Sequence, residues 1–519
     1  MRHRALGILL AVLMLQPIRG LQAQWMESVV HFAGPSLRER LDSLDTYAQR
    51  VRRDWAIPGM AVAVIKDGHL VFSEGYGVQD YETNVPVSSK SVFQIGSVTK
   101  SFTAALMAML VDEGLVSWDD RMCDVLPGFK LYDKDMEQTW KVRDLFCHGS
   151  GLGNNVGTWM ACMGYNREQI LQILSEVPPQ GTYHKGFAYN NAIFLWASAL
   201  IEHLTGKSWE DNMRERIFKP LGLSSAVVGE QGFLDAGKNA VSQYSFSYYK
   251  GKASSRRLKG EARGLYWADV IGPAGGAAMN IDDLALWGYF HINQGMVKGL
   301  RIISPEQMQE LHTGGNTVSS SQSYGKCWYL TDMGSYEIFY HTGTAYGHTS
   351  LCFCSEEDNL VVAIAASSEV IGRPRLAIAY RALDLFRLEK DGLKIDSLRD
   401  RNREALEAMN AGKVNMNSRT HYAKHPRQKE PTAAQIVGKY SKKEPYGPAT
   451  ISSANGKLFI SIGPQQKKAP LVHLKDGRYS FYMGGHTFPL YVEWNDAKTA
   501  VKGFTIDFGR DEDVGMWKK

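Results

Sequence analysis

Strand-like patterns stand at both ends of a long helical region, and this order constrains the fold of the chain more than any other feature. An apolar run at 59–65 and a returning run at 69–75 are joined by an Asp-Gly pair typical of a tight hairpin turn. Apolar residues at helical spacing dominate from 97 to 312, and strand-like runs return at 324–366. We therefore predict an α/β domain whose sheet takes strands from both ends of this region.

The individual elements follow from the spacing of the apolar residues. Helices are predicted at 35–54, 97–110, 191–204, 209–218, 282–293, 305–312 and 375–387. The later strands of the domain are predicted at 324–330, 336–341, 348–354 and 360–366.

The chain changes character twice after this domain. Residues 389–430 are rich in charge and poor in aromatic side chains, which predicts a charged linker. From 431 to 519 the pattern is all-β, with hairpin turns at Asn455-Gly456 and Asp476-Gly477. Short strands are expected at 457–462, 478–483, 489–493 and 501–508. Strands this short and regular predict a small β-barrel or sandwich.

The first 23 residues have the order of a secretory signal peptide. A basic start is followed by an apolar run at 5–15, and Ala23 is a small residue suited to cleavage. The apolar run is too short to span a bilayer. We predict cleavage after Ala23, a mature chain without a transmembrane segment, a periplasmic or secreted location, and a first folded domain at 24–388.

The charge balance argues against a nucleic-acid partner. The formal net charge is +5, but the first 23 residues hold three arginines and no acidic residue, which leaves +2 for the remainder. A nucleic-acid binder usually carries a clustered basic excess.

The cysteines predict neither a disulfide framework nor a zinc site. The six are Cys123, Cys147, Cys162, Cys327, Cys352 and Cys354. They are few for a chain of this length, and none has the CxxC spacing of zinc ligands. We expect mostly free buried thiols, with one bridge left open and Cys352 and Cys354 facing opposite sides of a strand. We expect no metal and no other cofactor.

A serine and a lysine three residues apart stand at the start of the helix predicted at 97–110. Ser97 and Lys100 share a helix face, so the hydroxyl oxygen and the amine can meet. A buried lysine loses its proton more easily and can act as a base toward a serine. Taken alone, the pair also fits a helix cap beside a surface lysine.

Two further short motifs carry side chains suited to acyl chemistry. Tyr189 and Asn191 precede a helix, where a phenol can relay a proton and an amide can hold a substrate carbonyl. His341 and Gly343 end a strand, and the glycine permits close approach of a ligand to the backbone. Each motif alone is compatible with a purely structural role.

In this order, the three motifs resemble the signature of the serine β-lactamase and penicillin-binding protein superfamily. The segments 57–61, 93–100, 145–152 and 272–276 are similar to family segments, and the resemblance covers about 35–388. It is greatest to class C β-lactamases and to the esterases and D-amino-acid peptidases built on that pattern. The resemblance implies an antiparallel sheet flanked by helices, plus a helical subdomain. The C-terminal barrel resembles the lipocalin-like domains attached to some of these hydrolases.

The resemblance also implies roles for the motif residues. Ser97 would be the nucleophile and Lys100 its base or proton relay, whereas Tyr189 would be the general base that later protonates the leaving group. Asn191 would hold the substrate. The backbone N–H groups of Ser97 and Thr344 would form the oxyanion hole, since Thr344 follows the third motif.

His341 stands where antibiotic-hydrolysing relatives carry a lysine. A neutral imidazole is a weaker anchor for a substrate carboxylate than an ammonium group. We therefore expect poor turnover of penicillins and cephalosporins and better turnover of an ester, amide or peptide.

The sequence thus predicts an exported serine hydrolase that forms an acyl-enzyme on Ser97. Three alternatives stay open: an acyltransferase that uses an alcohol or amine acceptor, a β-lactamase or D-Ala-D-Ala carboxypeptidase-like enzyme, and an inert peptidoglycan or ligand sensor. The partner is a small-molecule or peptide acyl substrate. The sequence does not determine that substrate, the oligomeric state or the role of the barrel.

Overall fold

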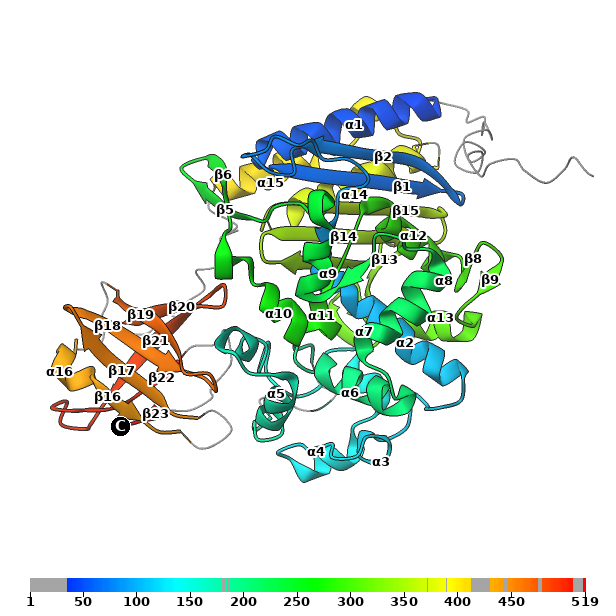
Figure 1. Ribbon diagram of the computed structural model, residues 1–519. Helices are drawn as coiled ribbons and strands as arrows, with labels where there is room; N and C mark the ends of the chain where they lie inside the picture. Colours follow the sequence, from blue (N-terminus) through cyan, green and yellow to red (C-terminus); the bar gives the residue numbers. More distant parts are fainter. Residues whose placement is uncertain are drawn as a thin grey trace, which may run out of the picture.

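The computed structural model describes residues 35–179, 183, 186–370, 372–388, 390–411, 430–442, 447–474, 478–506 and 517–519. These residues form an α/β domain and a C-terminal barrel (Figure 1). The predicted signal peptide and the expected turn at Asp476-Gly477 lie outside the described residues.

One eight-stranded sheet forms the centre of the α/β domain. In spatial order its strands are β10 (Asn316–Ser319), β11 (Gln322–Tyr324), β12 (Tyr329–Asp332), β13 (Glu337–Ala345), β14 (His348–Ser355), β15 (Leu360–Ala366), β1 (Gly59–Lys66) and β2 (His69–Gly77). All neighbouring pairs are antiparallel, and β1 joins the two ends of the region by pairing Lys66 with Leu360. The predicted antiparallel sheet with strands from both ends is therefore confirmed.

Helices cover both faces of this sheet. Val62 and Val64 of β1 belong to an apolar cluster with α1 (Leu37–Asp54) and α14 (Arg373–Arg387). Ala61 and Ala63, which alternate with them, belong to the cluster that contains α2 (Thr99–Asp112) and α12 (Ile281–Ile292). Because successive residues of a strand point to opposite faces, β1 is buried on both sides.

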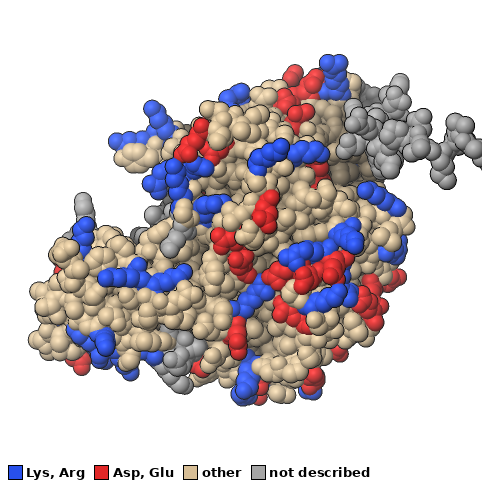
Figure 2. Space-filling model, in the orientation of Figure 1, with Lys and Arg blue, Asp and Glu red and all other residues tan. Residues whose placement is uncertain are grey.

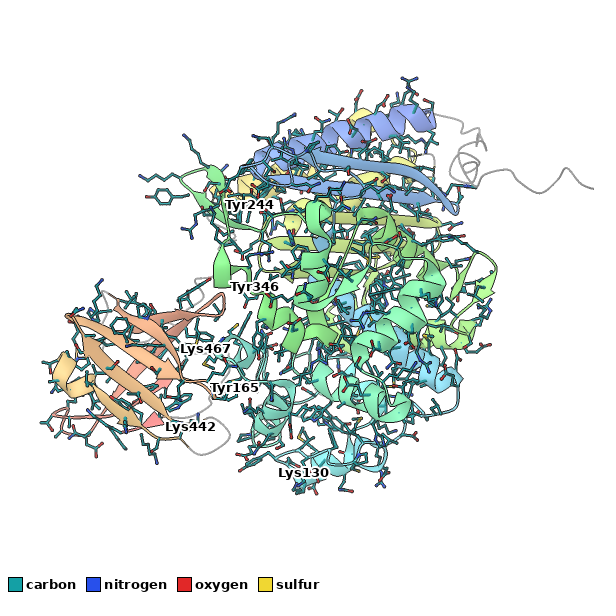
Figure 3. The ribbon with its side chains drawn as sticks, in the orientation of Figure 1. Lys130, Tyr165, Tyr244, Tyr346, Lys442 and Lys467 are labelled. Atoms are coloured by element: carbon teal, nitrogen blue, oxygen red, sulfur yellow. The ribbon has the colours of Figure 1, made fainter. Side chains whose placement is uncertain are left out.

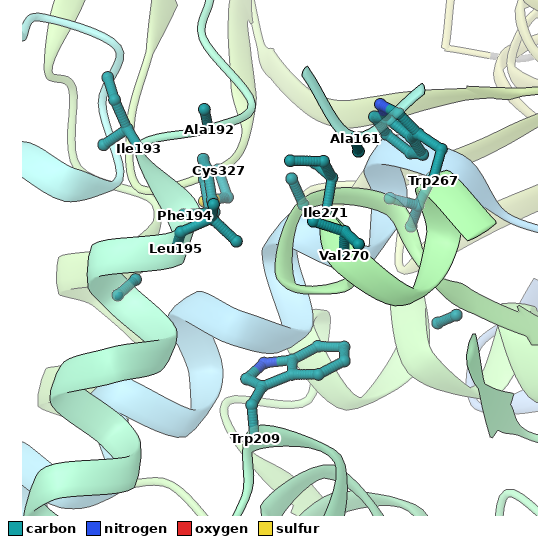
Figure 4. Packing of buried hydrophobic residues seen from close by; sticks show 14 of the residues in the cluster. Ala161, Ala192, Ile193, Phe194, Leu195, Trp209, Trp267, Val270, Ile271 and Cys327 are labelled. Atoms are coloured by element: carbon teal, nitrogen blue, oxygen red, sulfur yellow. The ribbon is translucent and has the colours of Figure 1, made fainter. Parts of the chain in front are cut away.

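The remaining helices and small sheets form the predicted helical subdomain and the edges of the domain. The helices are α3 (Met122–Val125), α4 (Lys134–Thr139), α5 (Arg167–Leu174), α6 (Phe194–Thr205), α7 (Trp209–Asn212), α8 (Lys219–Leu221), α9 (Gly229–Asp235), α10 (Leu265–Val270), α11 (Gly272–Gly275) and α13 (Pro305–Leu311). The small sheets contain β3 (Phe93–Gln94), β4 (Val227–Val228) and β7 (Ala277–Met279), the hairpin β5 (Tyr244–Tyr249) with β6 (Lys252–Arg257), and the hairpin β8 (Met296–Val297) with β9 (Leu300–Arg301). Apolar residues around the start of α6 and along α10 belong to one buried cluster (Figure 4).

Two details differ from the sequence predictions. The expected strand at 324–330 is two strands, because Cys327 adopts a φ of 68° in a turn between β11 and β12. Its residues are nevertheless buried, so the turn carries the apolar pattern of a strand. Cys352 and Cys354 lie on the same face of β14, as residues two apart must, and both contact Gly288 of α12. The six cysteines are free thiols.

Part of the expected linker packs onto the α/β domain. α15 (Arg401–Asn410) places Asn402 against Trp55, whose indole N–H donates to the Asn402 Oδ1 at 2.7 Å. Ala405 and Met409 of the same helix are buried in the cluster with α1 and α14.

The C-terminal unit is a nearly closed antiparallel barrel, which confirms the all-β prediction. After α16 (Ala433–Ile436) come β16 (Gly438–Tyr440), β17 (Ala449–Ala454), β18 (Lys457–Ile462), β19 (Lys467–His473), β20 (Tyr479–Met483), β21 (His486–Trp494), β22 (Val501–Ile506) and β23 (Trp517–Lys518). Two backbone hydrogen bonds between Ser441 and Lys518 link the first and last strands.

Two turns of the barrel rest on the α/β domain. A side chain at Gly484 would place its Cβ 2.4 Å from the carbonyl oxygen of Cys162, and one at Gly463 would lie equally close to that of Met163. Backbone therefore meets backbone at both turns. Tyr346 and Lys467 mark the two sides of this junction (Figure 3).

Charged side chains of both signs occur on the face shown in Figure 2. Lys and Arg lie among Asp and Glu over the α/β domain there, in keeping with the small net charge. Within the described ranges, no helix is both long and apolar enough to cross a bilayer.

Candidate active site

Two glycines bring the Ser97 segment against β13. Ser97 lies in a short 3-10 helix, Gly96–Val98, that leads directly into α2. Gly96 has a φ of 49°, and a Cβ there would lie 2.6 Å from the Thr344 nitrogen. A Cβ at Gly343 would lie 1.8 Å from the Ile95 carbonyl oxygen. Only glycine permits this approach, which sets the Thr344 backbone beside the Ser97 segment.

Lys100 is buried beneath Ser97 and its amine has three hydrogen-bond partners. Nζ lies 3.0 Å from Ser97 Oγ, 2.6 Å from Asn191 Oδ1 and 2.8 Å from the Ala274 carbonyl oxygen. None of the three is a carboxylate. Because burial disfavours the ammonium form, the pKa of Lys100 is lowered from 10.5 to about 7.

Tyr189 is held between Lys100 and a buried histidine. Its hydroxyl is hydrogen-bonded to Ser97, and Lys100 Nζ lies 4.8 Å from the centre of its ring. The centre of the His148 ring lies 4.1 Å from the centre of the Tyr189 ring. Burial raises the pKa of Tyr189 well above 10, so the phenol is neutral near pH 7.

The amide of Asn191 has a fixed orientation. Its Oδ1 accepts from Lys100, and its Nδ2 donates to Asn155 Oδ1 at 3.3 Å. The neighbouring Asn190 caps the turn before α6, since its Oδ1 accepts from the Ala192 N–H at 2.8 Å. This capped turn delays the start of α6 to Phe194, three residues later than the spacing predicts.

His341 is buried with both ring nitrogens engaged. Nδ1 lies 2.7 Å from the Thr342 carbonyl oxygen, so it carries the proton, and Nε2 accepts from the Tyr324 hydroxyl at 2.9 Å. Burial, reinforced by Lys100, lowers the pKa of His341 to about 3. The imidazole is therefore neutral at pH 7, and it does not provide the charge that a lysine would provide.

A cavity of about 500 Å³ opens beside Ser97. Of the predicted site residues, Ser97, Tyr189, Asn191, His341 and Thr344 line it, whereas Lys100 lies behind Ser97. The other lining residues are Asn155, Trp159, Trp267, Tyr329, Thr342, Ala345, Tyr346, Glu369, Arg375, Gly485, His486 and Thr487. Gly485, His486 and Thr487 belong to the barrel, so both units of the chain form this cavity.

The lining residues form two groups, which we call the polar end and the aromatic end. The polar end comprises Tyr189, Tyr329, His341 and Arg375, and ring contacts or charge interactions connect its members. The aromatic end comprises Trp159, Trp267, Tyr346 and His486, where His486 stacks on Trp159 at 4.2 Å and Trp267 meets Tyr346 edge-on.

Arg375 is a buried cation that sequence reasoning missed. Its guanidinium donates to the Gly343 carbonyl oxygen at 2.5 Å. Among the described residues no carboxylate interacts with it, and its Nε has no hydrogen-bond partner there. Burial lowers its pKa to about 10, so it remains charged at pH 7. A buried charge without a protein counter-ion is costly unless a ligand completes its bonding.

The described part of the chain contains no cluster of three or more His, Cys, Asp or Glu side chains arranged to hold a metal ion. Among the described residues that line the cavity, Glu369 is the acidic side chain, and Arg375 stands in place of any lysine.

A family model described as Beta-lactamase matches residues 47–385. The chain belongs to the Beta-lactamase family. It is 34% identical over 195 residues to penicillin-binding protein 4 of Amycolatopsis lactamdurans, a match that covers 37% of this chain and 48% of that protein. It is 30% identical over 175 residues to a teichoic acid D-alanine hydrolase of Staphylococcus aureus, covering 33% and 42%. The chain thus spans less than half of the length of these relatives.

Among solved structures, the octameric penicillin-binding protein homologue from Pyrococcus abyssi has the same fold over most of the chain. The TM-score is 0.59 at 19% identity, with coverage of 91% of this chain and 98% of that one. The likeness in fold therefore covers most of both chains.

Proposed function

We propose that the protein is an exported serine hydrolase that cleaves an ester, amide or peptide through an acyl-enzyme on Ser97. The observation that carries this proposal is the contact between Ser97 Oγ and a buried Lys100 amine whose pKa is lowered to about 7. An amine with that pKa is partly unprotonated at neutral pH, which a general base requires.

The pKa directions distribute the proton steps between Lys100 and Tyr189. Neutral Lys100 takes the hydroxyl proton of Ser97 while Oγ bonds to the carbonyl carbon. The backbone N–H groups of Ser97 and Thr344 then bind the oxyanion. Tyr189 gives its proton to the leaving atom as the scissile bond breaks, and Lys100 returns the proton to Tyr189. Water then takes the place of the leaving group. As its oxygen bonds to the acyl carbon, Tyr189 accepts a proton from the water and passes its own proton to Lys100. Lys100 returns that proton to Ser97 Oγ as the acyl bond breaks, and Ser97 is regenerated.

The polar end indicates what the departing part of the substrate carries. Tyr189 must lie beside the leaving atom to protonate it, and Arg375 belongs to the same end of the cavity. We propose that the leaving group bears an anion, such as the carboxylate of a departing amino acid or peptide. Our expectation of poor β-lactam turnover depended on the neutral His341 being the anchor for a substrate carboxylate. Arg375 supplies a positive charge in the same cavity, so that argument no longer holds.

Covalent labelling tests the nucleophile. A fluorophosphonate probe should add one phosphonyl group to the wild-type chain, and peptide mass spectrometry should locate it on Ser97. Ser97→Ala should take up no probe. Ser453→Ala, which removes an exposed serine of the barrel, is the matched control and should label like the wild type. Labelling that persists in Ser97→Ala would overturn the assignment.

Product analysis distinguishes hydrolysis from transfer to another acceptor. Release of the free acid in the presence of added alcohol or amine supports a hydrolase, whereas an acylated acceptor as the main product supports the acyltransferase alternative. Export is tested separately: the mature protein should occur outside the cytoplasm with Gln24 as its first residue.

A further inference from the structure

The barrel contributes a wall to the cavity that contains Ser97. Met483 and His486 face each other across the β20–β21 hairpin, and Gly484 and Gly485 between them have φ values of 55° and 91°. Two successive positive φ angles are typical of the tight hairpin turn that matches strand twist. Gly484 sits on the Cys162 backbone, which fixes the tip of the hairpin relative to the α/β domain.

This contact brings His486 onto Trp159. The two rings are stacked at a centroid distance of 4.2 Å and an interplanar angle of 11°. Trp159 is held nearby, because the indole N–H of Trp267 donates to the carbonyl oxygen of its neighbour Thr158 at 3.0 Å. The Tyr346 hydroxyl contacts the Cys162 sulfur at 3.1 Å. These contacts connect the side chains of the aromatic end to one another through their rings and their neighbouring backbone.

The position of this surface indicates which part of a substrate it meets. In our proposed mechanism Tyr189 protonates the leaving atom, so the leaving group lies at the polar end with Tyr329 and Arg375. Ser97 and Thr344 line the same cavity, and the aromatic end is the group of lining residues that the leaving group would not occupy. We therefore assign the acyl group to it. Glu369 lines the cavity and interacts electrostatically with Tyr346, which disfavours a negatively charged acyl group.

We propose that the β20–β21 hairpin of the barrel determines acyl-group specificity, and that the stacked pair of His486 and Trp159 selects a flat aromatic acyl group without negative charge. This inference rests on the proposed acyl-enzyme function. The barrel is then a part of the active site, and His486 is a specificity-determining residue.

Two esters with one leaving group test this assignment. p-Nitrophenyl phenylacetate carries an aromatic acyl group, and p-nitrophenyl acetate carries a small one. His486→Ala should lower kcat/KM for the phenylacetate about tenfold, the size of one lost aromatic contact, and change the acetate less than about twofold. His486→Phe preserves a stacking ring and should restore the preference. His473→Ala removes a barrel histidine whose ring contacts Tyr479; it is the matched control and should behave like the wild type.

The possible outcomes separate the inference from the function. An equal change for both esters, or no change for either, would overturn the role of the hairpin while leaving the hydrolase intact. If the wild type cleaves neither ester and Ser97 takes up no phosphonate, the function fails and the inference fails with it. Should His486→Ala not fold, as judged by circular dichroism, Trp159→Leu makes the same test from the α/β domain.

A second series checks which end receives the acyl group. The two substrates are p-nitrophenyl acetate and a naphthyl acetate, which share the acetyl group and differ in the leaving group. The kcat/KM of His486→Ala, divided by that of the wild type, should be the same for both esters. A ratio that falls with the larger leaving group would place that group on the aromatic end and overturn the acyl assignment.

Discussion

The polar end and the aromatic end of the cavity differ in how their side chains are held. Around Ser97, hydrogen bonds to Lys100 and Tyr189 fix the reacting groups, and all of these residues lie on short motifs of the α/β domain. At the aromatic end, ring stacking and backbone contacts join His486 of the barrel to Trp159 of the helical subdomain. The proposed bond chemistry and the proposed acyl selection therefore depend on separate contacts, so each should be open to change without loss of the other.

Removal of the nucleophile should have the largest effect. Ser97→Ala should lower turnover of every substrate by at least about 1000-fold, since loss of a catalytic serine removes the covalent route. The thermal unfolding midpoint should stay close to that of the wild type, because Ser97 borders the cavity and is only half-buried. Steady-state kinetics and calorimetry measure both. Turnover near the wild-type level would place the reaction elsewhere.

Tyr189→Phe should lower kcat about 100-fold while changing the preference between acetyl and phenylacetyl esters little. A proton donor contributes roughly this factor, and the phenyl ring retains its contact with the His148 ring. A shift in acyl preference as large as the loss in rate would mean that the two ends are not independent.

Arg375→Met should weaken the use of substrates with an anionic leaving group by about 10- to 100-fold, mainly through KM. Hydrogen bonds to charged groups contribute roughly 1.5–3 kcal/mol, which corresponds to that range. Esters with an uncharged leaving group should be affected less. Because Arg375 also holds the Gly343 carbonyl, Arg375→Lys is the necessary companion: it keeps the charge and should recover part of the loss.

Substitution of His341 should have the smallest effect of these changes, and the measurement is the pH dependence of kcat/KM. kcat/KM should rise with pH through a midpoint near 7, since Lys100 accepts the Ser97 proton only when it is neutral. His341, with its pKa lowered to about 3, should add no step near pH 6.5. His341→Gln should leave the midpoint unchanged, although the rate can fall up to about tenfold from two lost hydrogen bonds. A midpoint that moves in this variant would show that His341 titrates.

The same contrast explains what the sequence could predict. Ser97, Lys100, Tyr189 and Asn191 are close in sequence to helix starts, and their chemistry is apparent from residue type and spacing. Trp159 and His486 are far apart in the chain, and nothing in either segment indicates that the barrel hairpin meets the helical subdomain. Arg375 lies at the start of a helix that the sequence predicted well, but a helical arginine is ordinarily a surface residue.

The fold could be predicted where the spacing of apolar residues was clear. It could not be predicted where a turn was buried or where a charged helix packed onto the domain. The sheet, the closing helix α14 and four of the eight barrel strands (β18, β20, β21 and β22) agree with the apolar spacing, whereas β16, β17, β19 and β23 were not predicted. The turn at Cys327 was misread because a buried turn shows the same residues as a strand. The packing of α15 was missed because its exposed face is highly charged.

The position of β1 between β2 and β15 has a consequence for how the chain can be made. β1 is apolar on both faces from residue 59 to residue 65, and its partner β15 emerges from the ribosome only after the whole helical subdomain has been synthesised. Until then one edge of β1 has no strand to pair with, and exposed apolar edges favour association with other chains. Long-range pairing of this kind also slows folding. Fragments that stop before Leu360 should therefore accumulate as aggregates, whereas fragments that extend past Ala366 regain the partner strand and with it a route to the soluble state.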